Sequence, residues 1–285
     1  MQFSTVAMIL TASVAHAVWN IASKYKKEDT LLFVWAYSCA SALLWVPISL
    51  ILTVEGQQEL DWRLAVGAVI SSALHIAYSL ILQAGYERAE LGVVYPIARG
   101  SGPVLTILFA TLLMGERISP GALLGAFIVI AGIFVVTGNP FRSGSRPLQG
   151  MLWGAAIGTA IAGYTLWDGY SVISLHLDPV RYYASTLLLQ SLILTPGAMR
   201  RRNRIPTAVR VDIIPILIIA VCSPLAYILV LTAMQSMPLA LVAPLRETSI
   251  IVGSLLSYWL FRENHLARRI AGAVVVLTGI AIISL

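Results

Sequence analysis

Long apolar runs follow one another along almost the whole chain, and they constrain its fold more than any other feature. A helix that crosses the hydrocarbon core of a bilayer, about 30 Å thick, needs about 20 mainly apolar residues. Of the 285 residues, 58% are hydrophobic and only 11% are charged. A soluble domain carries about a quarter charged residues, so this chain cannot cover a water-facing surface, and we expect an integral membrane protein.

The sequence divides into ten such runs. They cover residues 3–22, 31–54, 64–84, 91–114, 120–138, 150–172, 180–199, 213–236, 239–261 and 270–285. The connections are short, and the longest leaves no room for an inserted soluble domain. We therefore predict an all-α membrane protein with ten transmembrane helices.

Basic residues indicate the orientation of these helices. The loops after the odd-numbered runs hold fourteen Lys and Arg residues, whereas the opposite side holds only Arg63, Arg117 and Arg181. Loops rich in Lys and Arg stay in the cytoplasm. We therefore expect both termini outside, in a bacterial inner membrane.

The two halves of the chain resemble each other at an offset near 148 residues. Matching positions include Trp19 and Trp167, Tyr78 and Tyr227, Pro96 and Pro244, Arg99 and Arg246, Glu116 and Glu263, Gly125 and Gly272, and Gly132 and Gly279. Each half has five predicted helices, an odd number, so the second half must be inserted upside down. The sequence predicts two inverted five-helix repeats, residues 1–138 and 150–285, joined by a linker over 139–149.

Several of these segments resemble EamA-type carriers of the drug/metabolite transporter superfamily. The most specific are Leu91–Pro96, Gly115–Arg117, Leu239–Pro244 and Arg262–Glu263, and the resemblance covers essentially the whole chain. It implies a secondary transporter, often an exporter, of small metabolites such as amino acids.

Two arginines lie inside predicted spans, where a charge is costly and is a functional candidate by default. From a rise of 1.5 Å per residue, Arg99 lies roughly 12 Å deep from the cytoplasmic side and Arg246 roughly 10 Å deep from the outer side. Asn20 lies near the level of Arg99, and its counterpart Asp168 lies near the level of Arg246. We expect Arg99 to bind a substrate anion.

Asn20 and Arg246 are further candidates to bind the substrate. Arg246 is alternatively part of an outer gate, paired with Asp168 or Glu247. The alternative for Arg99 is an ion pair with Glu247 that only holds the helices together, because intramembrane charges often pair.

The matched prolines point to the translocation path. Pro96 and Pro244 each remove a helical hydrogen bond and free a carbonyl, and such backbone survives in a membrane only where it faces protein or a water-filled cavity. We assign both prolines to gating. The alternative is a tolerated kink.

Aromatic residues cluster on the same predicted helices and are candidates to line a substrate cavity; the alternative is core packing or interfacial anchoring. They are Trp19, Tyr78, Tyr95, Trp167 and Tyr227. His75 lies in the middle of a span and is a further candidate, as a substrate ligand or proton relay, or as a side chain that only hydrogen-bonds a neighbouring helix.

Other chemistries find no support. We see no metal-ligand spacing, no phosphate-binding glycine loop and no nucleophile motif, so we expect no metal, no cofactor and no nucleic-acid partner. The expected partners are a small-molecule substrate and the lipid bilayer. Gly121 and Gly125 form a small-residue pattern that suits packing within a monomer or the face of a weak homodimer.

These observations favour a secondary transporter of a small carboxylate-bearing metabolite, with an amino acid as the leading candidate. The driving force would be a proton gradient or the gradient of the substrate itself. One alternative is a carrier or flippase for a phosphonate or lipid-phosphate headgroup, which the same two arginines suit. Another is an intramembrane lipid-modifying enzyme, but the sequence offers no converging catalytic residues, so we do not predict an enzyme.

Overall fold

The computed structural model describes residues 3–23, 25–52, 61–89, 91–137, 147–249, 252 and 266–284. Within these ranges every regular element is a helix. The long helices are α1 (Phe3–Ser23), α2 (Thr30–Leu52), α3 (Trp62–Arg88), α4 (Leu91–Leu113), α5 (Pro120–Thr137), α6 (Pro147–Ile173), α7 (Pro179–Met199), α9 (Ile213–Met234) and α12 (Leu266–Ser284). Each begins and ends within a few residues of a predicted run, because apolar backbone can satisfy its hydrogen bonds in lipid only as a helix.

The ninth predicted run, 239–261, is helical in α10 (Leu239–Arg246). Most of the run beyond residue 249 lies outside the described residues. Three helices are long and apolar enough to cross a membrane by themselves: Thr30–Leu52, Trp62–Arg88 and Ile213–Met234. Shorter apolar helical stretches occur in four others of the described helices. The count of ten spans therefore stays a prediction.

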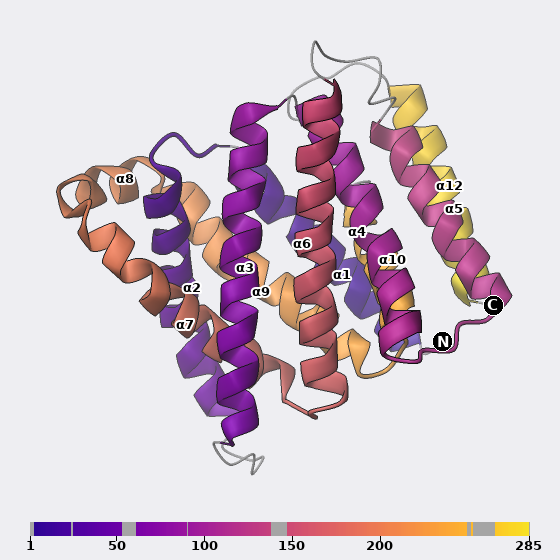
Figure 1. Cartoon of the computed structure of the whole chain (residues 1–285), viewed down its shortest axis with the longest axis horizontal. Coiled ribbons are helices and arrows are strands. Elements are labelled where there is room, and N and C mark those ends of the chain that lie inside the picture. Colours follow the sequence, from indigo (N-terminus) through magenta and orange to yellow (C-terminus); the bar gives the residue numbers. More distant parts are fainter. Residues whose placement is uncertain are drawn as a thin grey trace.

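The connection between α7 and α9 holds helices that the sequence analysis missed. A short 3-10 helix over Arg202–Arg204 leads into α8 (Ile205–Val211). Ala208 packs against Leu32 and Ala198, while the arginines of the 3-10 helix are exposed. α8 projects at the upper left of Figure 1. The hydrophobic-length argument could not find it because seven residues are too short to span a bilayer.

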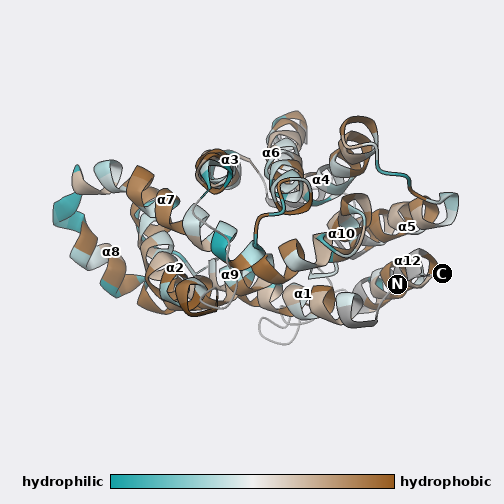
Figure 2. Ribbon diagram, turned by 90° about the horizontal axis from the view of Figure 1, so that it is seen from below, coloured by the Kyte–Doolittle hydropathy of each residue, from teal (hydrophilic) through white to brown (hydrophobic). Residues whose placement is uncertain are grey.

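The helices pack in pairs that are far apart in the sequence. α5 lies along α12, α4 along α6, α1 along α9 and α2 along α7 (Figure 1). Seen from below, α3, α6 and α4 form one side of the bundle and α2, α9 and α1 the other, and α10 lies between α1 and α4 (Figure 2). Large apolar side chains such as Leu43, Ile51 and Leu113 are exposed on the outside, as expected of a surface that faces lipid.

Glycines let α5 and α12 approach closely. A Cβ on Gly132 of α5 would lie 2.5 Å from Cγ2 of Val276 and 3.1 Å from the carbonyl oxygen of Gly272, both on α12. A Cβ on Gly279 of α12 would lie 2.8 Å from Val129 and 2.7 Å from the carbonyl oxygen of Gly125, both on α5. The two helices run in opposite directions in Figure 1. Each glycine therefore meets a valine and a glycine of the other helix.

The helix at the start of the ninth predicted run is interrupted after Arg246. Pro244 lies inside α10, and the helix ends two residues later at Arg246. The amides of Glu247 and Thr248 then bond the carbonyls of Pro244 and Leu245 over 3.1 Å each, which is the tighter pattern of a turn. Ser249 is helical again. Glu247 is thus placed at a break in the helix, in the interior of the bundle.

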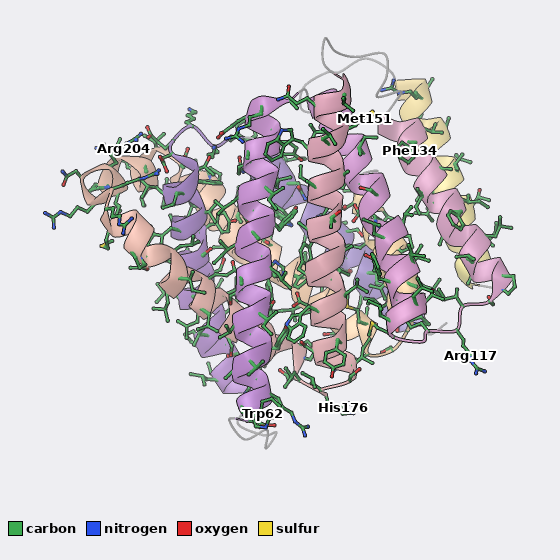
Figure 3. The ribbon with its side chains drawn as sticks, viewed as in Figure 1. Trp62, Arg117, Phe134, Met151, His176 and Arg204 are labelled. Carbon is green, nitrogen blue, oxygen red and sulfur yellow. The ribbon has the colours of Figure 1, made fainter. Side chains whose placement is uncertain are left out.

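Two carboxylates bind backbone amides near opposite ends of the bundle. At the end where Figure 3 labels Arg117, Glu116 accepts from the amides of Leu239 and Ala240, the first residues of α10, over 2.8 and 3.0 Å. At the end where it labels Arg204, Asp212 accepts from the amides of Lys27 and Glu28 over 3.0 and 3.1 Å.

Gly115 allows Glu116 to reach the first amides of α10. Its φ of 68° lies in the left-handed region that favours glycine, and it turns the chain after α4.

Candidate functional site

Two buried arginines share one buried carboxylate in the bundle interior. Arg99 of α4 donates from Nη1 to Oε2 of Glu247 over 3.0 Å. Arg246, at the end of α10, donates from Nε and Nη2 to Oε1 of the same side chain over 3.4 Å each. All three side chains are almost fully enclosed, with residue exposures of 6%, 3% and 1% for Arg99, Arg246 and Glu247. The sequence alternative in which Arg99 pairs with Glu247 is therefore present as a contact, together with the expected pair of Arg246 and Glu247.

Helix α1 supplies polar partners to Arg99. Nη2 of Arg99 donates to Oδ1 of Asn20 over 3.3 Å, as the predicted levels of the two residues suggested. Nη1 lies 3.4 Å from Nε2 of His16, and Trp19 donates to Nδ1 of the same ring over 3.2 Å. A neutral imidazole has only one acceptor nitrogen, so His16 cannot accept from both Trp19 and Arg99. We favour the shorter Trp19 bond, which leaves N–H groups of His16 and Arg99 facing each other.

Helix α6 holds the other face of Arg246. Its Nη1 donates to Oγ1 of Thr165 over 3.3 Å. Its guanidinium carbon also lies 5.9 Å from the centre of the Tyr164 ring, within the range of a cation–π contact. The guanidinium is thus oriented from both α6 and α10.

Asp168 lies in a second polar cluster and is fully buried. Its carboxylate accepts from the hydroxyl groups of Tyr182 and Tyr227 over 2.6 Å each and lies 2.9 Å from Nε2 of His75. The expected contact of Asp168 with Arg246 is therefore not what the structure shows. The two residues were matched by depth alone, but α6 turns Asp168 toward α3, α7 and α9.

Aromatic rings connect the two clusters. Tyr164 stacks on His75 with the ring centres 4.3 Å apart. It also meets Tyr78 and Tyr227 edge to face at 5.2 and 5.9 Å. A continuous series of contacts therefore runs from Arg99 through Glu247, Arg246, Tyr164 and His75 to Asp168.

The other predicted residues are less central. Trp167 donates to the carbonyl oxygen of Gly67 over 3.0 Å and joins α6 to α3. Pro244 is buried in α10. Tyr95 and Pro96 lie on α4, but their side chains are outside the described part of the structure. No group of three or more His, Cys, Asp or Glu side chains that could hold a metal occurs among the residues described.

Several site residues were not found by sequence reasoning. Tyr164 and Thr165 precede Asp168 by about one helical turn and share its side of α6, which is a signal that spacing could have given. Tyr182 and Tyr183 have no tyrosine counterparts in the first half of the chain, so the repeat could not reveal them.

The chain was compared with known proteins. The model of the EamA-like transporter family matches residues 3–138 and again residues 148–285. The chain belongs to the EamA-like transporter family. Members of this family are membrane transporters, so the expected class of fold and the transport role agree with this result.

Individual relatives add detail. A Pseudomonas aeruginosa protein described as a multidrug transporter is 48% identical over 61 residues, which is 21% of this chain and 54% of that protein. The chain thus matches only about half the length of this curated relative. One solved structure, titled only as the crystal structure of a protein, covers 100% of this chain and 99% of its own with a TM-score of 0.80 at 17% identity. At that identity the likeness shows the fold alone.

Proposed function

We propose that this family member is a secondary transporter that moves a small carboxylate-bearing metabolite by alternating access, with amino acids as the leading substrates. The main support is that Arg99 and Arg246 converge on one carboxylate, that of Glu247, inside the bundle. Guanidinium groups bind carboxylates through several N–H donors in a planar fork. A site that binds a carboxylate of its own chain has the donors and the charge to bind that of a substrate.

The charge of the arginine site favours an anion. Two guanidinium groups and one carboxylate leave one positive charge among Arg99, Arg246 and Glu247. An anion entering here would meet a positive potential that the low dielectric of the interior strengthens.

Alternating access suits a carrier built of two halves that are inserted in opposite orientations, and the packing of α5 on α12 supports this arrangement. Gly132 meets Gly272 and Val276, which are the repeat counterparts of Gly125 and Val129, the residues that Gly279 meets. Such an exchange between antiparallel helices is what a two-fold axis perpendicular to the helices produces. For helices that cross a bilayer, that axis lies in the membrane plane.

The orientation belongs to the same proposal. We place the end of the bundle that carries Arg204 in the cytoplasm and both termini outside, in a bacterial inner membrane. Figure 3 supports this placement by showing Arg204 at one end and Arg117, Trp62 and His176 at the other.

The test is a thermal-shift screen of the purified protein against amino acids, organic acids and phosphonates, followed by binding assays with Arg99 variants. Arg99→Lys keeps the charge but loses the planar fork, so it should bind more weakly. Arg99→Ala should lose about 1.5–3 kcal/mol, or roughly 10- to 100-fold in affinity, while the protein stays folded. Arg246→Ala should also weaken binding, because its guanidinium is the second donor group of the same site.

Wild-type affinity in Arg99→Ala would contradict the receptor role and leave Arg99 as part of a structural ion pair. A screen in which only phosphonates and lipid phosphates bind would favour the headgroup carrier. Because a secondary transporter runs in either direction, export is tested separately, by counterflow in oriented vesicles.

Transport of an organic cation is a second candidate. Tyr78, Tyr164, Tyr183 and Tyr227 are gathered near the buried Asp168, and aromatic rings beside a carboxylate suit a cation. The partial match to a protein described as a multidrug transporter also supports this candidate. Asp168→Asn should abolish the binding of an aromatic cation if it is correct. Arg99→Ala should then leave that binding intact.

A further inference from the structure

We propose that Glu247 is the proton-binding group of this carrier: a substrate anion replaces it between Arg99 and Arg246, and the displaced carboxylate takes up a proton, so that anion and proton bind together. This inference rests on the proposed function, because it needs the two arginines to be the anion receptor. It goes further because it gives Glu247 two roles. The residue occupies the anion site when no substrate is bound, and it couples the binding of the anion to the binding of a proton.

The geometry shows why Glu247 occupies an anion site. Both of its oxygens are used, Oε2 by Arg99 and Oε1 by Arg246, and the residue is 1% exposed. The arginines come from helices of different halves, α4 and α10, and the carboxylate lies between them. A substrate carboxylate that takes the same donors must displace it.

The position of Glu247 in the chain allows such a displacement. The residue follows the end of α10, in the turn between Arg246 and Ser249. Its amide makes turn-type bonds to the carbonyls of Pro244 and Leu245. A side chain at a helix break can change its direction through a few backbone angles without moving a whole helix.

The groups around Glu247 decide what happens to its charge. Arg99 of α4 and Arg246 of α10 contact Glu247 directly. His16 of α1 lies against Arg99 and Tyr164 of α6 against Arg246, and Asp168 and Tyr227 form the cluster beyond Tyr164. The segment Pro120–Thr137 of α5 carries no titratable side chain. Arg99 and Arg246 are therefore the cations that keep Glu247 ionised. A bound substrate anion occupies the N–H donors of both.

An ionised carboxylate without these partners is very unfavourable in a buried site, so the displaced Glu247 binds a proton from water on the open side. The net charge is then the same in both states. The empty site has two guanidinium groups and one carboxylate, and the loaded site has two guanidinium groups, one anion and a neutral Glu247. Neither state carries an extra charge through the membrane interior.

Asp168 does not meet the same requirements. Its partners are the hydroxyl groups of Tyr182 and Tyr227 and the ring of His75, none of which has to leave when an anion binds to the arginines. Its charge is therefore not linked to the anion by competition.

The experiment measures the binding of acetate, the smallest carboxylate, to the full-length protein in detergent as a function of pH. The affinity of the wild type for acetate should fall about tenfold for each unit by which the pH rises. This slope applies over the pH range in which Glu247 is ionised without acetate and protonated once acetate has displaced it. About one proton should be taken up per acetate, measured as alkalinisation of a weakly buffered solution. Infrared difference spectra should show the carbonyl band of a newly protonated carboxylic acid.

Variants assign these signals to Glu247. Glu247→Gln should bind acetate more tightly than the wild type at neutral pH, without pH dependence and without proton uptake. Glu247→Asp keeps a carboxylate, so it should restore the pH dependence and the proton uptake. Glu87→Gln makes the same chemical change at an exposed position near the end of α3 and should behave like the wild type. If Glu247→Gln does not fold, the infrared band of the wild type and the pH dependence of Glu247→Asp still decide.

Different failures are distinguishable. Acetate binding to the wild type without proton uptake would overturn the role of Glu247 and leave the arginine receptor standing. Proton uptake that persists in Glu247→Gln would have the same meaning. A lack of acetate binding by both the wild type and Glu247→Gln would overturn the receptor itself.

Discussion

Asp168 is held by donors from three other helices: His75 on α3, Tyr182 on α7 and Tyr227 on α9. A fully buried carboxylate is tolerated only with such partners, because its unpaired charge would cost several kcal/mol. Asp168 therefore joins four helices, and its assignment to a gate stays a prediction. Tyr164 connects this cluster to the arginine site, because it stacks on His75 and contacts the guanidinium of Arg246.

This role predicts the effect of removing single hydroxyl groups. Tyr182→Phe and Tyr227→Phe keep the ring but remove a donor from Asp168, so each should lower the free energy of unfolding by about 1.5–3 kcal/mol. Tyr170→Phe is the control, because Tyr170 is 42% exposed. Unfolding of the purified protein in detergent provides the measurement. A result equal to the control for both variants would mean that the hydroxyl groups do not hold Asp168.

At the scale of elements, the pair of α5 and α12 depends on the close approach of two helix backbones. Gly132 and Gly279 bring the helix backbones together against Val276 and Val129. Small residues at such a crossing allow close packing in a membrane, where the hydrophobic effect does not drive helices together.

Alanine at these positions should therefore destabilise the protein. Gly132→Ala places a Cβ 2.5 Å from Cγ2 and 2.9 Å from the amide nitrogen of Val276, and backbone cannot give way as a side chain can. We expect a loss of about 1–3 kcal/mol in the free energy of unfolding, and a similar loss for Gly279→Ala, whose Cβ would meet the backbone of Gly125 and Val129. Gly121→Ala on α5 is the matched control, since its Cβ meets nothing within 4 Å. Equal stability of all three variants would argue against the tight crossing.

The start of α2 gives a second prediction at this scale. Asp29 accepts from the amides of Leu31 and Leu32 over 3.0 and 3.2 Å and pairs with Arg201. Burial by itself raises the pKa of Asp29, but the Leu32 amide, the charge of Arg201 and the Leu31 amide outweigh it, so the pKa lies below its ordinary value. A carboxyl group of this kind stabilises the fold above its unfolded pKa, and the effect disappears as the pH falls through its folded pKa.

Asp29→Asn keeps a good helix cap but removes the charge. The variant should be less stable than the wild type at neutral pH, and the difference should close as the pH is lowered through and below about 4. Unfolding midpoints across this pH range test the expectation. Arg201→Gln should add little further loss in the Asp29→Asn background, and fully additive losses would show that the two residues are not coupled.

At the scale of the whole molecule, fourteen basic residues against three predict which end of the bundle is cytoplasmic. A reporter that is active only in the cytoplasm should be inactive when fused after Leu285 and active when inserted between Arg200 and Arg210. The opposite pattern would reverse the orientation. It would leave the internal site unchanged, because the site does not depend on which side is which.

The sequence predicts the helices well and their partners only in part. Apolar length is a local property, so the described helices lie where the runs predicted them, whereas the short amphipathic α8 was missed. Depth is also local, and it correctly placed Asn20 beside Arg99. Rotation of a helix about its axis is set by packing, which is why Asp168 faces Tyr182 and Tyr227 rather than Arg246. Pro244 predicted a freed carbonyl in the turn before it. The break after Arg246 and the sharing of Glu247 by two arginines both needed the structure.

The contact of Glu116 with the first amides of α10 has a mechanical consequence. Glu116 belongs to the first half of the chain and α10 to the second, so any tilt of α10 away from α5 must break two charge-assisted hydrogen bonds. The carboxylate and the helix end can part only if solvent molecules replace each of them as a partner. In the alternating access proposed above, water must therefore enter this end of the carrier when it opens. Sucrose outside the vesicle, which is excluded from protein surfaces, should slow this opening in proportion to the water that the opening takes up.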